Sequence, residues 1–266
     1  MLDRFNRKIN YLRVSVTDRC NLRCRYCMPG DDFVMLSHDD ILRFDEIVNV
    51  VREGAAMGIY KVRLTGGEPL VRRGIVKLVE MIAAVQAIKD LAMTTNGLLL
   101  DKFARPLAEA GLKRVNISLD TMNASRFSEL TSGGDIRQVL RGIDAAVDAG
   151  LENVKLNCVI TDSACEPEAL SVKRFAEDNG FQVRFIHQMN LGEGEFSVVE
   201  GGEGGDCERC NRLRLTANGY IRPCLFSDIS FNVRKMGAKE ALVAAVLNKP
   251  EHGTVCSQNQ FYNIGG

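Results

Sequence analysis

The regular alternation of short apolar strands with longer helical segments constrains this fold most. Before residue 191 the expected strands are Tyr11–Thr17, Lys61–Thr65, Leu91–Thr95, Arg114–Ser118, Asn153–Ile160 and Gln182–His187. The helices expected between them include Asp39–Met57, Gly74–Ala87, Asp101–Ala110, Ile136–Ala149 and Pro167–Asn179. Strands that alternate with helices predict an α/β fold, in which helices cover a parallel sheet.

The number of these units bounds the architecture. Six strand-helix units fall short of a complete eight-fold barrel, so a partial, open parallel βα barrel and a doubly wound sheet both fit. We predict the partial barrel over residues 1–191 and a short linker rich in Gly and Glu over residues 192–206. Residues 207–266 then form a small C-terminal region with a helix around Gly237–Leu247.

Composition excludes several classes of protein. The formal net charge is zero, which argues against wholesale binding to nucleic acid or a membrane surface. There is no apolar run of about 18 residues, and the first ten residues lack the apolar core of a signal peptide, so we expect a cytoplasmic protein. Nine cysteines are many for that compartment and favour metal ligation over disulfides.

Polar motifs follow four consecutive strands at the point where each strand ends. The motifs are Thr17-Asp18-Arg19-Cys20, Thr65-Gly66-Gly67-Glu68-Pro69, Thr94-Thr95-Asn96-Gly97 and Ser118-Leu119-Asp120. In a parallel barrel the carboxyl ends of the strands meet at one face, where the chemistry gathers. The motifs therefore predict one active site at that face.

Cys20, Cys24 and Cys27 form the first cysteine group, directly after the first strand. Thiolates bind iron well, and three of them on a four-iron cubane leave one iron open for a cofactor or substrate. A zinc site or buried free thiols are the alternatives, although structural zinc sites usually take four protein ligands. The spacing favours a [4Fe–4S] cluster.

Cys207, Cys210 and Cys224 form a second group of three. They can hold another cluster with an open iron, or a zinc ion with Cys256 or His252 as fourth ligand. Cys158 lies within an apolar strand and is predicted to be a core thiol. The residue types alone leave iron–sulfur and zinc both open at the second group.

The three-cysteine motif followed by Gly-Gly-Glu-Pro resembles the radical S-adenosylmethionine (SAM) superfamily. The resemblance implies a partial barrel in which the open iron binds SAM. The reduced cluster cleaves SAM to a 5′-deoxyadenosyl radical, which abstracts hydrogen from the substrate. It also implies that Tyr26 packs near the adenine, and that Gly66, Gly67 and Glu68 lie against the SAM amino group.

Longer segments resemble the MoaA-type GTP 3′,8-cyclase family of molybdenum cofactor biosynthesis, a family of lyases. They are Leu12–Asn21, Lys61–Pro69, Cys210–Arg214, Arg222–Phe226 and the ending Ile264-Gly265-Gly266. The resemblance implies that a second [4Fe–4S] cluster binds the guanine of GTP in a shared cavity. The residues implied to contact the nucleotide are Arg13, Arg63, Thr94, Lys155, Arg212 and Arg214, and those implied to contact SAM include Gly67, Ser118 and Met189. An electron donor such as flavodoxin or ferredoxin, and a homodimer, are also expected.

Two departures from that family keep other functions open. The segment Gly192–Asp206 is shorter than its counterpart, and His187-Gln188 stands where the family usually has an acidic residue. A paralogue acting on another nucleotide or on a peptide therefore remains an alternative. A non-catalytic iron–sulfur or zinc protein is a further one, but an electron carrier would not need a SAM site. As a lone histidine at a strand end, His187 is expected to be packed and hydrogen-bonded.

Overall fold

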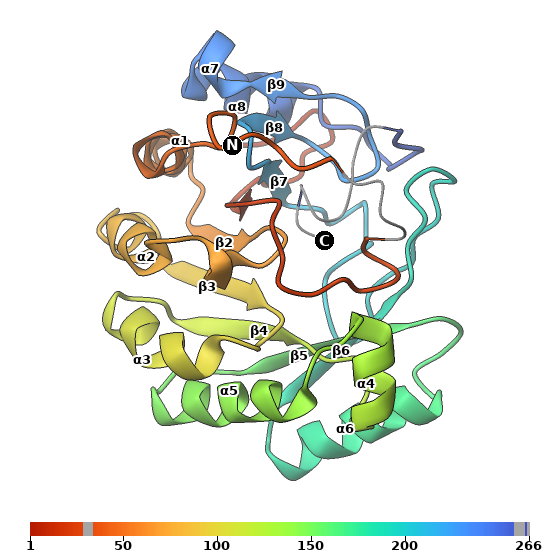
Figure 1. The fold of residues 1–266 in the computed structure, drawn as a ribbon. Coiled ribbons are helices and arrows are strands. Elements are labelled where there is room, and N and C mark those ends of the chain that lie inside the picture. The colour runs from red at the N-terminus through yellow and green to blue at the C-terminus, as the bar shows by residue number, and fades with distance from the viewer. Residues whose placement is uncertain (29–33, 258–263, 265–266) are drawn as a thin grey trace.

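A nine-stranded sheet forms the centre of the molecule in the computed structural model, which describes residues 1–28, 34–257 and 264 (Figure 1). The sheet order is β6-β5-β4-β3-β2-β1-β7-β8-β9. The strands are β1 (Tyr11–Ser15), β2 (Lys61–Thr65), β3 (Asp90–Thr95), β4 (Arg114–Ser118), β5 (Lys155–Ile160), β6 (Gln182–His187), β7 (Arg212–Leu215), β8 (Tyr220–Arg222) and β9 (Phe231–Asn232).

The first six strands lie side by side in chain order, and all are parallel. A doubly wound sheet would reverse its strand order at an internal switch point, and this order does not. The six predicted strands are confirmed, although β1 ends at Ser15 and not at Thr17. The sheet therefore has the topology of an open βα barrel, as predicted.

The crossover helices cover one face of this sheet, as Figure 1 shows for α1, α2, α3 and α5. The helical segments are α1 (Phe44–Ala56), the short 3-10 turn η1 (Pro69–Val71), α2 (Ile75–Ala83), α3 (Leu100–Glu109), α4 (Ala124–Thr131), α5 (Ile136–Asp148), α6 (Pro167–Asp178), α7 (Val233–Met236) and α8 (Ala238–Leu247). The sequence patterns did not predict α4, α7 or the strands β7–β9. No helix among the described residues is long and apolar enough to cross a membrane.

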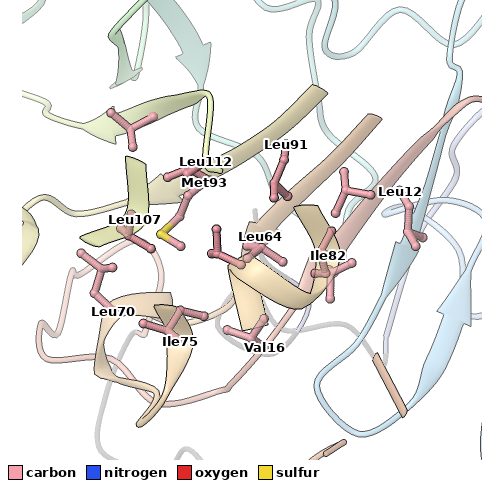
Figure 2. Packing of buried hydrophobic residues seen from close by; sticks show 14 of the residues in the cluster. Leu12, Val16, Leu64, Leu70, Ile75, Ile82, Leu91, Met93, Leu107 and Leu112 are labelled. Carbon is pink, nitrogen blue, oxygen red and sulfur yellow. The ribbon is translucent and has the colours of Figure 1, made fainter. Parts of the chain in front are cut away.

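Alternate side chains of each strand point in opposite directions, which separates the core from the site. Leu12 of β1 and Leu64 of β2 are fully buried against the helices (Figure 2). Figure 2 shows Ile75 and Ile82 of α2 among the same buried cluster. On each strand the residues that alternate with these buried ones point to the opposite face of the sheet. Arg13 of β1 and Arg63 of β2 are examples, and the cavities lie on that face.

The segment after β6 returns the chain across the open side of the barrel. Glu200 forms an isolated antiparallel bridge with Phe185 of β6, through hydrogen bonds of 3.1 and 3.0 Å. β7 then pairs in parallel with β1, at the far end of the six strands. Residues 192–206 thus run from the β6 edge towards the β1 edge. The division into a barrel, a linker and a C-terminal region stays a prediction, and Gly265-Gly266 lie outside the described residues.

Candidate active site

Two adjoining cavities occupy the face of the sheet opposite the helices. The first, with about 1030 Å³ of empty space, is lined by Cys20, Cys24, Cys27, the Gly-Gly-Glu motif and the ends of β3 and β4. The second, with about 1210 Å³, is lined by Cys207, Cys210, Cys224 and a group of basic residues. Both are open to solvent, and Asn157, Ile186 and Met189 line both. The two predicted cysteine groups therefore face one continuous space.

The first cysteine group lies on a tight turn that is hydrogen-bonded to the end of α4. The backbone N–H groups of Cys27 and Met28 both donate to the carbonyl of Cys24, at 3.0 and 2.9 Å. The N–H of Arg23 donates to the carbonyl of Thr131, the last residue of α4, at 3.2 Å. A helix that the sequence patterns missed therefore positions the loop that carries these cysteines.

Burial and mutual repulsion keep these thiols from ionising alone. Burial raises the pKa of Cys24 and of Cys27 to about 12; Cys20 adds to both shifts, and Cys27 and Asp120 add to that of Cys24. A bound cation reverses this preference, because a coordinating thiol is deprotonated outright. No group of His, Cys, Asp and Glu among the described residues is arranged for a single ion. A cubane places each thiolate on a different iron, so a trio of half-buried thiols around an open cavity fits a cluster.

The Gly-Gly-Glu-Pro motif packs directly on the backbone that leads into the cysteine loop. The N–H groups of Gly67 and Glu68 donate to the carbonyls of Thr17 and Arg19, each at 2.8 Å. A Cβ on Gly66 would lie 2.4 Å from the Thr17 oxygen, and one on Gly67 would lie 2.4 Å from the Arg19 oxygen. Only glycine permits these two approaches, so the motif fixes the end of β2 against the cluster loop.

Glu68 is buried in the first cavity and hydrogen-bonded to the next strand. Its Oε1 accepts from Thr95 Oγ1 at 2.8 Å and from the Leu70 N–H at 2.9 Å, and its Oε2 accepts from the Asn96 N–H at 2.7 Å. Burial nevertheless dominates and raises the pKa of Glu68 to about 7. A ligand that donates to this carboxylate would favour its ionised form.

Two further contacts join the cysteine loop to the strand ends. The Tyr26 hydroxyl donates to Asp120 Oδ2 at 2.8 Å, and the other oxygen of Asp120 accepts from the Val159 N–H at 2.8 Å. Asn96 Nδ2 donates to Asn21 Oδ1 at 2.8 Å and lies 3.8 Å from Cys20 Sγ. The Tyr26 ring is thereby held in the wall of the first cavity.

The second cavity is built on two rows of side chains that cross three adjacent strands. Strand register places Arg13 of β1 beside Arg63 of β2 on one side and beside Arg214 of β7 on the other. One pleat earlier, Tyr11 lies between Lys61 and Arg212. Like charges directly opposite one another on a sheet are destabilising, so an anion bound over this row of three arginines would be stabilising.

Several of these cations are incompletely satisfied within the described residues. The Nε atoms of Arg63, Arg184 and Arg212 are buried and have no hydrogen-bond partner there. With its amide turned to suit both neighbours, Asn116 accepts from Arg63 Nη1 at 3.0 Å and from Arg184 Nη1 at 3.2 Å. A buried donor without an acceptor is costly, so the cavity is suited to a ligand rich in acceptor oxygens.

The charges shift the ionisation of one another. Burial lowers the pKa of Arg13 well below its usual value, and Arg214 and Arg63 lower it further. Burial together with Arg212 brings the pKa of Arg214 to about 10. Burial alone would raise the pKa of Tyr11, but the surrounding cations bring it below its usual value. The electrostatic field of this cavity is therefore strongly positive.

The thiols of the second group share that field. Burial alone would raise the pKa of Cys210, yet Lys249 and Arg212 bring it below its usual value. Burial raises the pKa of Cys224, and Lys249 opposes the rise. All nine cysteines are described, and none forms a disulfide. A half-buried trio of thiols in a positive field fits a second cluster.

Most of the predicted ligand-binding residues line these cavities. Arg13, Arg63, Arg212 and Arg214 line the second cavity and Ser118 the first, while Met189 lines both. Thr94, implied to contact the nucleotide, lines the first cavity, where its Oγ1 is buried without a partner among the described residues. Lys155 is absent from both linings. Burial lowers its pKa, and the nearby charge of Arg184 lowers it further.

The residues of the second cavity that sequence reasoning missed include Tyr11, Lys61 and Arg184. Each lies two residues from another residue of the second cavity on the same strand, so the period-two alternation of β1, β2 and β6 was the available signal. His187 lines the first cavity and lies 3.6 Å from Glu200 Oε1. Cys158 is buried in the core, as predicted, and Cys256 Sγ lies 2.9 Å from Asp228 Oδ1.

Comparison with proteins of known family places this chain by its sequence. The sequence profile of the radical SAM superfamily matches residues 14–164. A GTP 3′,8-cyclase of Alkaliphilus oremlandii is 39% identical over 314 aligned positions, which cover 100% of this chain and 98% of the relative. The enzyme of the same name from Moorella thermoacetica is 42% identical, covering 92% of this chain and 91% of the relative. The first alignment is longer than the 266 residues of this chain, so that relative carries positions that are absent here.

Solved structures agree in fold. Streptococcus suis SuiB bound to the precursor peptide SuiA superimposes with a TM-score of 0.70 at 16% identity, covering 92% of this chain and 66% of that one. Native anSMEcpe with bound AdoMet superimposes with a TM-score of 0.57 at 20% identity, covering 70% of this chain and 53% of that one. At such identities the likeness concerns the fold alone, whereas the sequence relatives decide the family. The chain belongs to the radical SAM superfamily and, within it, to the GTP 3′,8-cyclase family.

Proposed function

We propose that this enzyme cyclises GTP by joining ribose C3′ to guanine C8, as the names of its relatives indicate for those proteins. The row of Arg214, Arg13 and Arg63 carries the proposal, because it lines the second cavity together with Cys207, Cys210 and Cys224. Guanidinium groups bind phosphate oxygens in bidentate geometry. A nucleoside triphosphate carries concentrated negative charge, which would complement the positive charge of this row.

The first cavity is the proposed site of SAM. When bound there, the [4Fe–4S] cluster and SAM supply the 5′-deoxyadenosyl radical. Cys20, Cys24 and Cys27 hold the cluster, and Glu68 offers its carboxylate to the SAM amino group. Tyr26, fixed by Asp120, is placed to pack near the adenine. These residues orient the cofactor and limit access of water to it.

The second cavity is the proposed site of the nucleotide. Arg13, Arg63, Arg212 and Arg214 bind the phosphates, and Lys61 and Arg184 extend the same positive wall. Cys207, Cys210 and Cys224 hold a second [4Fe–4S] cluster, on which the guanine would be oriented. Asn157, Ile186 and Met189 line both cavities, so the ribose would meet the radical site beside these residues. An electron donor such as flavodoxin or ferredoxin, and a homodimer, remain predictions.

Anaerobic turnover of the reconstituted protein tests the proposal. With SAM, dithionite and GTP carrying deuterium at C3′, we expect one deuterium atom in 5′-deoxyadenosine for each cyclised nucleotide. ATP and inosine triphosphate are the matched controls, because they share the triphosphate but differ in the base. SAM cleavage without transfer of the C3′ deuterium would contradict the proposal.

Action on a different purine nucleoside triphosphate is the second candidate, and the linker favours it. Phe196, Val199 and the stretch 202–206 line the second cavity, so the segment that is shortened here shapes the substrate site. A cavity bounded by a different segment can select a different base while keeping the phosphate-binding arginines. Deuterium transfer from a triphosphate other than GTP would identify this outcome.

A further inference from the structure

Lys249 is a buried cation that the proposed chemistry does not use. It follows α8, its exposed fraction is 1%, and it is among the largest fully buried side chains of the protein. Among the described residues, no carboxylate forms an ion pair with it. A buried ammonium costs free energy unless nearby groups compensate it, so its neighbours define its role.

Those neighbours are the chain segments that carry two of the second-group cysteines. Lys249 Nζ donates to the carbonyl of Arg212, two residues after Cys210, at 2.9 Å. It also donates to the carbonyl of Pro223, the residue before Cys224, at 2.6 Å. One ammonium therefore connects the start of β7 with the residue that follows β8. The same charge interacts with the Cys210 thiol.

Arg7 holds the third segment in the same way. Its Nη1 donates to the carbonyl of Cys207 at 2.7 Å and to that of Glu251 at 2.8 Å, and its Nη2 donates to the carbonyl of Pro250 at 2.6 Å. Asp3 accepts from Arg7 Nε at 2.6 Å and fixes the guanidinium. Arg7 thus hydrogen-bonds the backbone of residues 250 and 251, while Lys249 of the same loop hydrogen-bonds the segments of Cys210 and Cys224.

We propose that Lys249 and Arg7 are positioning residues for the second cluster: they clamp its three cysteine-bearing segments, and the Lys249 ammonium compensates the cluster's negative charge. This inference rests on the proposed second cluster. Outer-shell groups of this kind orient metal ligands and tune the metal. The fit also explains why a lysine is tolerated at a position with almost no exposure.

The test uses the full, anaerobically reconstituted enzyme. Lys249→Met removes the charge and both donors at similar length, whereas Lys249→Arg keeps them. Lys239→Met and Arg4→Met, at exposed positions of α8 and of the N-terminal segment, are the matched controls. Iron content, the rate of iron loss to a chelator and the EPR-monitored midpoint potential of each cluster are measured.

We expect Lys249→Met to lower the affinity of the second site for its cluster by about 10–100-fold and to shift that cluster's potential to more negative values. Lys249→Arg should restore the wild-type potential in large part. Arg7→Met should lower cluster retention with a smaller change in potential, because its contacts reach carbonyl groups only. The first cluster and uncoupled SAM cleavage should match wild type in every variant.

Lys249→Gln keeps an amide donor without charge and covers the case in which Lys249→Met fails to fold. A second cluster with wild-type potential in Lys249→Gln, or with wild-type potential and retention in Lys249→Met, would overturn the inference alone. A wild-type protein that holds zinc or nothing at Cys207, Cys210 and Cys224 would overturn this inference and the proposed second cluster together. Loss of both clusters in Lys249→Met with wild-type retention in Lys249→Gln would show a general folding role and overturn the inference.

Discussion

The two cysteine groups line two adjoining cavities, and the surroundings of the two groups are electrostatically opposite. Around Cys20, Cys24 and Cys27 lie the buried carboxyl of Glu68 and the half-buried carboxyl of Asp120, and desolvation raises the pKa of both carboxyls and of the Cys24 thiol. Around Cys207, Cys210 and Cys224 lie arginines and Lys249, which favour negative charge. The difference teaches that two similar sets of thiol donors can lie in opposite electrostatic surroundings, which suits the cationic cofactor proposed for the first and the anionic substrate proposed for the second.

Removing either cysteine group should have the largest effects and should separate the two roles. Replacing Cys20, Cys24 and Cys27 by alanine should remove about four irons and abolish SAM cleavage, because a three-thiolate cluster cannot form there. Replacing Cys207, Cys210 and Cys224 should also remove about four of the expected eight irons, but SAM cleavage uncoupled from the nucleotide should persist. Iron analysis and 5′-deoxyadenosine release measure both. Loss of SAM cleavage in the second variant would mean that the sites are not separable.

Replacing one arginine of the second cavity should have the next largest effect. Arg63→Met or Arg212→Met should weaken nucleotide binding about 10- to 150-fold, since each charge-assisted contact contributes about 1.5–3 kcal/mol. Uncoupled SAM cleavage should stay unchanged, as it should in the exposed control Arg105→Met. Calorimetry with GTP measures the affinity. Without nucleotide, Arg63→Met should melt at an equal or higher temperature, because it relieves buried like charge.

The pH dependence of the free energy of unfolding should show that the first cavity favours a neutral carboxyl at Glu68. Because its pKa is raised from 4.5 to about 7, the folded, ligand-free protein holds a proton that the unfolded chain releases between those values. The Glu68 contribution to stability is therefore present below about pH 4.5 and is lost as the pH rises to about 7, with a limiting slope of about 1.4 kcal/mol per pH unit. Denaturant unfolding of the apo-protein at pH 5, 6 and 7 checks this. Glu68→Gln should remove the slope, and an equal slope in both proteins would refute the assignment.

The smallest effect is expected at Asn96. Asn96→Ala removes the 2.8 Å hydrogen bond to Asn21 and the contact with Cys20 Sγ, and a neutral hydrogen bond contributes about 1 kcal/mol. Iron should leave the first cluster about five times faster in a chelator challenge, while the second cluster should be unaffected. The exposed Asn248 of the α8 terminus provides the control as Asn248→Ala. An equal effect on both clusters would indicate a global change.

The local pattern of the sequence determined the six parallel strands and both cysteine groups. Strand periodicity and the Gly stops after helices are short-range properties, so they can be read without the fold. Most of the basic residues of the second cavity followed from the family resemblance. The extra members, Tyr11, Lys61 and Arg184, follow from strand alternation once the face of each strand is known.

Only the tertiary structure decided how distant segments meet. β7 pairs with β1 across about 200 residues of chain, and this pairing places Arg214 beside Arg13 and so creates the arginine row. Within the predicted linker 192–206, Glu200 forms a bridge to Phe185 of β6, and several residues line the second cavity. Lys249 and Arg7 gave no signal in the sequence, because a buried lysine looks like a surface one until its partners are known. Long-range pairing depends on packing summed over the whole chain, which no local pattern encodes.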